Sequence, residues 1–347
     1  MWSPSVNGGV LRRRYLYAPQ LESYDVLAPR LHPWVALSAP RDVRGAVVST
    51  DVQGFRRTRC TAGIIDSSSS VADGIVLGGS FSFGVGAESD ADTLVSQLAG
   101  LTGLRLRNIG IRAATSTHEV IASMPFLEDG GPVVVCSGAN NLIASLQTSQ
   151  PRDVYGPLFF EQALAMVGSR SVNDVVDLVT GKQPAPVGVR GAIRGQLAGL
   201  ARRAPAAAGP AAAAEIEPLS FGERRELALR RQLRDLSMLV RLVGDPSRIT
   251  FCAQPFADTS TRGGVAQEQP LLGLHDRQLG VLWERVREYA LAIWSRHVDE
   301  LGVGVRNLGV RFLDLPAASF EGWSFVDRLH CRGEGYRQAA TMICEVL

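Results

Sequence analysis

Residues 74–84 read Gly-Ile-Val-Leu-Gly-Gly-Ser-Phe-Ser-Phe-Gly, and this stretch sets the expectation for the fold. Its apolar first half is typical of a short buried strand, and the glycines that follow permit a sharp turn into a helix. Further apolar runs of the same kind occur at residues 133–136, 249–253 and 310–313, and residues 104–109 form a weaker fifth candidate strand. Because helical patterns such as residues 93–101 lie between the runs, the sequence predicts an α/β fold with a parallel sheet covered on both faces.

Helical periodicity also marks residues 156–167, 222–243 and 276–301. Between residues 183 and 218, by contrast, proline, alanine, glycine and arginine dominate, which predicts a flexible insertion or linker. Residues before Val71 lack long helical periodicity, so we expect an irregular, partly β extension that packs against the main sheet. These expectations divide the chain into an N-terminal extension (1–70), the first part of the α/β domain (71–180), a flexible and helical insertion (181–245) and the second part of the domain (246–347).

The composition is that of a globular protein, with 347 residues of which 46% are hydrophobic and 20% charged. The 36 Lys and Arg residues nearly balance the 34 Asp and Glu residues, which gives no reason to expect a nucleic-acid partner. The first residues lack the charged start and apolar run of a secretory signal, and no stretch is apolar enough to span a membrane. We therefore expect a cytoplasmic protein without a membrane span, and the composition leaves the oligomeric state open.

Five cysteines are scattered along the chain and are never spaced as Cys-x-x-Cys. Neither a disulfide framework nor a zinc site is indicated, so we expect reduced thiols and no metal. Of the five histidines, His32, His275 and His297 belong to no pattern of chemical partners, and His118 is typical of a loop or a helix start. Only His330 is assigned chemistry.

Ser80 is the residue of the opening stretch with the clearest chemical potential, because it lies in the glycine-rich segment 78–86. At a strand-to-helix turn a serine can be held exposed at the carboxyl edge of a parallel sheet, where ligands bind. The alternative is a tight turn with no reactive group. A phosphate-binding loop is disfavoured, because no Gly-Lys-Ser/Thr follows and the glycines miss the Gly-x-Gly-x-x-Gly spacing.

Four segments, in order along the chain, together resemble the SGNH (GDSL-like) hydrolase family. The first is Gly78-Gly79-Ser80-Phe81-Ser82-Phe83-Gly84, a divergent form of the family's Gly-Asp-Ser block. The others are Asn-Ile-Gly-Ile-Arg-Ala at 108–113, Gly-Ala-Asn-Asn at 138–141 and Asp-Arg-Leu-His at 327–330, and Gln-Gly-Phe-Arg at 53–56 is similar to an element upstream of the first block. The resemblance implies a three-layer α/β/α sandwich, the flavodoxin-like SGNH hydrolase fold, with an N-terminal extension and a helical insertion.

The resemblance also implies which residues act. Ser80 would be the nucleophile, His330 the base that activates it and Asp327 the acid that orients the base. Backbone N–H groups of Ser80 and Ala113 and the side-chain amide of Asn140 would form an oxyanion hole. The implied activity is acyl transfer from a small-molecule ester or thioester, carrier-bound ones included, to water or another small-molecule acceptor, without a cofactor.

Three positions depart from the family pattern. Gly79 and Asn141 stand where relatives usually carry aspartates, which makes the expected site less negative. This change predicts a preference for anionic substrates, with Gly79, Asn141 and Arg112 as the residues that favour them. Ala113 stands for a glycine, which is a mild change unless the loop needs a positive φ. The departures leave open an alternative function, a catalytically silent SGNH-like binding or regulatory protein.

The site residues also have structural alternatives. Asn140 could cap a helix that contains Leu142 and Ile143, a common role for asparagine. Asp327 and His330 could form a surface ion pair that has no chemical role. The spatial arrangement of Ser80, Asp327 and His330 distinguishes these alternatives from a catalytic unit.

Overall fold

The computed structural model describes residues 4–27, 30–32, 35–69, 71–147, 219–260, 265–279 and 281–347. Residues 1–148 and 220–347 belong to one compact unit. The predicted helix at 156–167 and the predicted flexible segment at 183–218 lie outside the described residues. Within the described ranges, no helix combines the length and the apolar character needed to cross a membrane.

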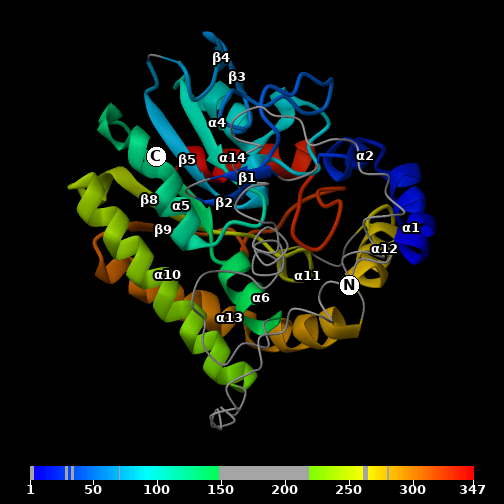
Figure 1. Ribbon diagram of the computed structural model, residues 1–347. Helices are drawn as coiled ribbons and strands as arrows, with labels where there is room; N and C mark the ends of the chain where they lie inside the picture. Colours follow the sequence, from blue (N-terminus) through cyan, green and yellow to red (C-terminus); the bar gives the residue numbers. More distant parts are fainter. Residues whose placement is uncertain are drawn as a thin grey trace, which may run out of the picture. The chain divides into compact units, whose positions relative to one another are not determined.

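A five-stranded parallel sheet forms the centre of this unit (Figure 1). Its strands are β5 (Gly74–Gly78), β6 (Leu106–Gly110), β7 (Val133–Ser137), β8 (Ile249–Ala253) and β9 (Arg311–Asp314). The prediction of a parallel sheet is confirmed, with strand ends within two residues of those expected. The spatial order is β6-β5-β7-β8-β9. In a doubly wound sheet of this order, ligands bind at the carboxyl end of the first strand, where the winding direction reverses.

Helices cover both faces of the sheet. They are α4 (Leu94–Thr102), α5 (Ser116–Ser123), α10 (Phe221–Val243), α13 (Val281–Asn307) and α14 (Gly333–Cys344). On one face, Leu77 and Val135 pack with apolar side chains of α5, α10 and α13. On the other face, Val76 and Val134 pack with α4 and α14. Neighbouring strand residues face opposite cores because side chains alternate along a strand, and the result is a three-layer α/β fold.

Short helical segments connect the main elements. They are α3 (Ser80–Phe83), α6 (Ala139–Gln147) and α11 (Ala257–Ser260), with the 3₁₀ turns η1 (Asp90–Asp92), η2 (Met124–Asp129) and η3 (Pro246–Arg248). Helices α3 and α6 directly follow β5 and β7, so each begins at the carboxyl edge of the sheet. The side chains of their first turns are therefore candidates for a shared site.

Helix α10 confirms the helix predicted at residues 222–243. A capping box starts it, because the Ser220 hydroxyl accepts from the Glu223 N–H (3.3 Å) and the Glu223 carboxylate accepts from the Ser220 N–H (2.8 Å). Gly244 ends it in the left-handed conformation. The helix packs against α5, α6 and α13. It is therefore part of the helical layer rather than of the insertion predicted at 181–245.

The single helix predicted at residues 276–301 is two helices in the structure. Helix α12 (Gln269–Leu279) ends before α13 begins at Val281. The Trp283 indole donates to Asp276 Oδ1 (2.8 Å) and so links the two helices. The apolar spacing that predicted the helix starts at Leu282, so it belongs to α13 and could not reveal the break.

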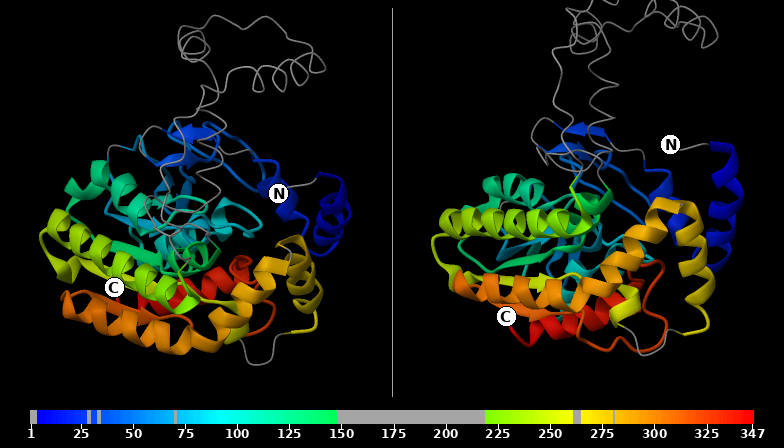
Figure 2. Two further views of the ribbon diagram at one scale, coloured as in Figure 1. Left: turned by 60° about the horizontal axis from the view of Figure 1, so that its bottom comes forward. Right: turned by 90° about the horizontal axis from the view of Figure 1, so that it is seen from below.

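The N-terminal extension contains helices as well as the predicted β structure. Its elements are α1 (Pro4–Tyr17), α2 (Gln20–Asp25), and the hairpins β1–β2 (Arg30–His32 with Ala36–Ser38) and β3–β4 (Thr58–Cys60 with Gly63–Ile65). The expectation of an irregular segment was wrong for α1 and α2. Helix α1 has no amphipathic stripe, so periodicity could not reveal it, and it packs against α12 (Figure 2).

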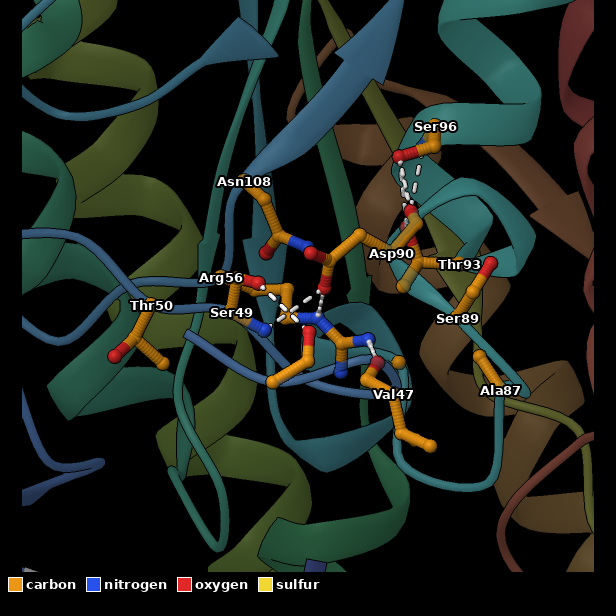
Figure 3. Close-up of polar contacts among 12 residues, drawn as sticks. Val47, Ser49, Thr50, Arg56, Ala87, Ser89, Asp90, Thr93, Ser96 and Asn108 are labelled. Atoms are coloured by element: carbon orange, nitrogen blue, oxygen red, sulfur yellow. Dashed lines mark hydrogen bonds and ion pairs between the residues drawn. The ribbon is translucent and has the colours of Figure 1, made fainter. Parts of the chain in front are cut away.

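Arg56 ties the extension to the α/β unit. Its guanidinium lies 2.6 Å from Asp90 Oδ1 and donates to the Val47 carbonyl oxygen (Figure 3). It also donates to the Tyr24 hydroxyl (3.0 Å). The Tyr24 hydroxyl in turn lies 2.7 Å from the carbonyl oxygen of Gly84, just after α3. Arg56 is fully buried, so this charge is stable there only because it is paired and hydrogen-bonded.

Candidate active site

Ser80 stands where β5 turns into α3. Gly78 has a φ of +148°, and a Cβ there would lie 2.2 Å from Ser82 Oγ and 2.3 Å from the Cys136 carbonyl oxygen. Glycine is therefore required for this turn. On its other side the Asn108 amide donates to the Ser82 carbonyl oxygen (2.9 Å). The turn holds the half-buried Ser80 at the carboxyl edge of the sheet.

Ser80, His330 and Asp327 form one hydrogen-bonded chain. His330 Nε2 lies 2.6 Å from Ser80 Oγ, and His330 Nδ1 lies 2.9 Å from both carboxylate oxygens of Asp327. The side chain of Asp327 is 3% exposed and that of His330 14%. The alternative of a surface ion pair is therefore wrong, because the carboxylate is buried and the imidazole links it to a serine 250 residues earlier.

The segment that carries Asp327 and His330 is anchored on both sides. Asp327 Oδ1 accepts the backbone N–H groups two and three residues further on (2.9 and 3.0 Å). Between the two residues, Arg328 forms ion pairs with Asp258 of α11 and with Asp276 of α12 (2.6 Å to Asp276). These contacts fix the direction in which the His330 imidazole points.

Two residues that no sequence pattern indicated also surround Asp327. Arg14 of α1 places Nη2 3.5 Å from Asp327 Oδ2, and the buried His275 of α12 interacts with the same carboxylate electrostatically. Burial by itself would raise the pKa of Asp327, but His330, His275 and Arg14 outweigh it and hold that pKa well below its usual range. Burial lowers the pKa of His275 to about 4, so this imidazole is neutral at neutral pH.

Asn140 lies in the first turn of α6 and its side chain does not cap that helix. The amide donates to the Ala114 carbonyl oxygen (2.7 Å), which leaves its second N–H free for another acceptor. A Cβ at Gly79 would lie 2.3 Å from the amide nitrogen, so an aspartate at this position would displace Asn140. The amide therefore stands directly beside Ser80, whose own N–H has no acceptor within α3.

Ala113 occupies the turn that follows β6. The turn is tight, because Ile111 donates to the Gly78 carbonyl oxygen (3.0 Å) and accepts from the Ala114 N–H (3.1 Å). Ala113 has a φ of +62°, in the left-handed region. The loop therefore does need a positive φ, and the alanine is strained rather than a mild replacement, at a cost of about 1–2 kcal/mol.

Two residues predicted to contact substrate have other roles. The Arg112 guanidinium donates to the carbonyl oxygens of Tyr24 (2.8 Å) and Leu27, so it anchors the end of α2. Asn141 is buried, and its side chain accepts from the Ser116 N–H (2.9 Å) and donates to the Ser116 hydroxyl (2.7 Å). The predicted preference for anionic substrates therefore loses the support of both residues.

Asn141 belongs to a second buried polar group, the Glu119 cluster. Its members are Ser116, Glu119, Ser137, Asn141, Gln232 and Asp235, and all of them are buried. Ser137 donates to Glu119 Oε1 (2.9 Å), and Ser116 donates to Asp235 Oδ2 (2.7 Å). Burial raises the pKa of Glu119 to about 8, so this carboxyl is uncharged at neutral pH. The cluster joins α5, α6, α10 and β7.

The described residues offer little for metal or disulfide chemistry. No group of three or more His, Cys, Asp or Glu side chains among them is placed to hold a metal ion. All five cysteines lie in the described ranges and are unpaired, and Cys136, Cys252 and Cys331 are buried. The chemical groups of this edge of the sheet are therefore the serine, the histidine, the carboxylate and the amide donors.

No protein-family model matches the chain, and no curated protein does either. One solved structure, described as "BT4096 a gut microbial diltiazem-metabolizing enzyme", is similar over 81% of this chain and 48% of that chain, with a TM-score of 0.36 and 10% identity. This chain thus spans about half the length of that solved chain. A likeness of this size says nothing about activity, so function has to come from the site's own residues.

Proposed function

We propose that the chain is a serine-dependent acyl-transfer enzyme of the SGNH type, which carries an acyl group on Ser80 and passes it to water or to a small-molecule acceptor. The observation that supports this proposal is the chain from Ser80 Oγ through His330 to Asp327, with separations of 2.6 and 2.9 Å. A free serine hydroxyl is a poor nucleophile at neutral pH, and a base within hydrogen-bond reach makes it reactive.

The proposed reaction starts when Ser80 Oγ attacks the carbonyl carbon of an ester or thioester and its proton moves to His330 Nε2. Negative charge develops on the carbonyl oxygen, where the N–H groups of Ser80, Ala113 and Asn140 would stabilise it. His330 returns the proton to the departing alcohol or thiol, and the acyl group stays on Ser80 as an ester. The same base then activates the acceptor, whose attack releases the acyl group and restores the serine.

The charge on Asp327 suits this cycle, because His330 becomes positive in both halves of the reaction. A buried carboxylate beside Nδ1 keeps the Nε2 atom directed at the serine and stabilises the imidazolium. The low pKa of Asp327 means that it is ionised throughout the neutral range. Two features thus support a catalytic unit over a catalytically silent relative: the short serine–histidine contact and the charge of the carboxylate.

A fluorophosphonate probe tests the proposal, because it reacts covalently with an activated serine. We expect the purified full chain to gain the mass of one probe on Ser80, and Ser80→Ala to gain none. Ser82→Ala is the matched control. The Ser82 hydroxyl donates to the Leu77 carbonyl oxygen and not to His330, so this substitution should leave labelling of Ser80 unchanged. A folded parent protein that stays unlabelled would support the silent binding or regulatory protein instead.

Ester and thioester panels then distinguish the acceptors. Hydrolysis releases free acid in water alone, whereas acyl transfer produces a new ester or amide only when an alcohol or amine is added. We expect both product types, if formed, to disappear together in His330→Ala, because both halves of the reaction use the same base. Turnover that persists in Ser80→Ala would reject the acyl-enzyme.

A further inference from the structure

A pocket of about 320 Å³ lies on the N-terminal extension, built from residues that play no part in the candidate active site. Three of its lining residues are arginines. The lining consists of Arg44, Gly45, Ser49, Arg57, Arg59, Ile64 and Asp90. None of these residues belongs to a sequence motif of the candidate active site.

Strand geometry explains why the arginines converge. Arg57 and Arg59 lie two residues apart at β3, and residues with this spacing point to the same side of a strand. Arg59 pairs with Ile64 of the neighbouring strand β4. Arg44 forms a β-bridge with Ser49, whose carbonyl oxygen accepts from the Arg57 N–H (3.1 Å). Three adjacent backbone segments thus bring three guanidinium groups to one pocket.

The negative charge in the pocket wall is already matched. Asp90 is buried, and its Oδ1 lies 2.6 Å from Arg56 Nε and accepts from the Ser49 N–H (3.0 Å), as Figure 3 shows. Arg56 reaches Asp90 from the interior of the protein, so this pair is complete without the three arginines of the pocket. Asp90 therefore does not balance their charge.

The arginines of the pocket have weak partners at most. Arg57 lies 3.7 Å from Asp66 and 4.0 Å from Asp42, at the long end of ion-pair distances, and its buried Nε has no hydrogen-bond partner. Among the described residues, no carboxylate lies within 4 Å of the guanidinium of Arg44 or of Arg59. The lining of this small pocket therefore carries more positive than negative charge.

We propose that this pocket binds a phosphoryl group. Guanidinium groups are planar donors that pair two N–H groups with two oxygens of a phosphate, and several of them are needed to match its double negative charge. A pocket of this size accommodates pyrophosphate or the phosphate end of a small phosphorylated metabolite. The proposal does not depend on acyl transfer at Ser80.

Titration calorimetry of the full chain with pyrophosphate, at constant ionic strength, tests the site. We expect saturable binding at one site, weakened about tenfold in each of Arg59→Gln and Arg44→Gln, because each removes charged hydrogen bonds to the ligand. Arg241→Gln, an exposed arginine at the end of α10, is the matched control and should bind as the parent does. Equal binding by all four proteins would overturn the proposal, and so would the absence of saturable heat with pyrophosphate and with ribose 5-phosphate alike.

Two further ligands identify the chemistry that the site recognises. Ribose 5-phosphate distinguishes an organic from an inorganic source of the phosphoryl group, and saturable binding of either one supports the site. Succinate carries two carboxylates, so binding as tight as that of both phosphoryl ligands would reject the phosphoryl assignment. Thermal unfolding without ligand shows whether the variants fold; removing one of three like charges should not lower the melting temperature.

Discussion

Two buried carboxylates on this fold, Asp327 and Glu119, are in opposite states. Asp327 has Arg14 and His330 beside it, and its pKa lies well below the usual range. Glu119 accepts a hydrogen bond from a serine and has no cation among the main influences on its pKa, which burial raises to about 8. Burial disfavours the charged form at both sites, and only neighbouring positive charge reverses that effect.

The comparison separates two kinds of polar cluster. Around Asp327 the charge is retained, and an imidazole links the carboxylate to a serine by hydrogen bonds, which is an arrangement suited to chemistry. In the Glu119 cluster the carboxyl is neutral and hydrogen bonds connect side chains of α5, α6, α10 and β7, which is an arrangement suited to joining helices. Both clusters lie close to the carboxyl ends of the central strands, so position alone does not distinguish them.

The largest expected effect on turnover comes from replacing one of these two carboxyl side chains by its amide counterpart. Asp327→Asn should lower turnover by about 10,000-fold, because the amide no longer supports the productive imidazole tautomer or its charged form. Glu119→Gln should leave turnover close to that of the parent, since Glu119 is already uncharged at neutral pH. Steady-state rates with the best substrate of the ester and thioester panels measure both, and similar losses in the two variants would contradict the comparison.

Adjacent asparagines provide the next test. Asn140→Ala should reduce turnover by about 100- to 1000-fold with little loss of stability, because it removes an amide donor beside Ser80. Asn141→Ala should instead cost about 1–3 kcal/mol of folding free energy, because it leaves the buried polar groups of Ser116 unsatisfied. Rates per folded molecule and urea unfolding separate the two outcomes; a reversed pattern would mean that the roles of the two residues are exchanged.

The pH dependence of stability should reveal the raised pKa of Glu119. In the folded protein this pKa is about 8, and in the unfolded chain it is near the ordinary value of about 4.5. Between these values the folded state holds the Glu119 proton and the unfolded chain does not, so the contribution of Glu119 to stability falls as pH rises, by up to about 1.4 kcal/mol per pH unit. Glu119→Gln should remove this slope, which urea unfolding at several pH values measures. An unchanged slope would mean that Glu119 is ionised in the folded protein.

The smallest effect on stability is expected at Ala113, whose backbone N–H belongs to the candidate oxyanion hole. Ala113→Gly should stabilise the protein by about 1 kcal/mol, because glycine relieves the positive φ but adds flexibility to the unfolded chain. Ala114→Gly is the matched control, since Ala114 is buried and does not have a positive φ, and it should destabilise. Melting temperatures of the two variants should therefore move in opposite directions. A lower melting temperature for Ala113→Gly would show that the alanine carries no strain.

The sequence by itself determined the sheet and the candidate triad. Each strand is a local apolar run, each turn after it has a glycine or polar signature, and the four blocks appear in chain order. These features depend on neighbouring residues, so local patterns predicted the sheet, and the resemblance of the four blocks implied that Ser80 and His330 lie together at one edge of it. The helical periodicity of α10 is equally local, which is why that helix was predicted almost to its ends.

Tertiary structure decided everything that depends on segments distant in the chain. Helix α1 has no periodicity of its own, yet its packing against α12 carries Arg14 to Asp327, some 300 residues later. Tertiary contacts also decide which of the two adjacent asparagines lies near Ser80. They likewise make Arg112 an anchor for α2, and no local pattern encodes either result. The same holds for the arginine pocket. Packing and charge pairing between distant segments depend on which elements come into contact, and local sequence patterns do not predict those contacts.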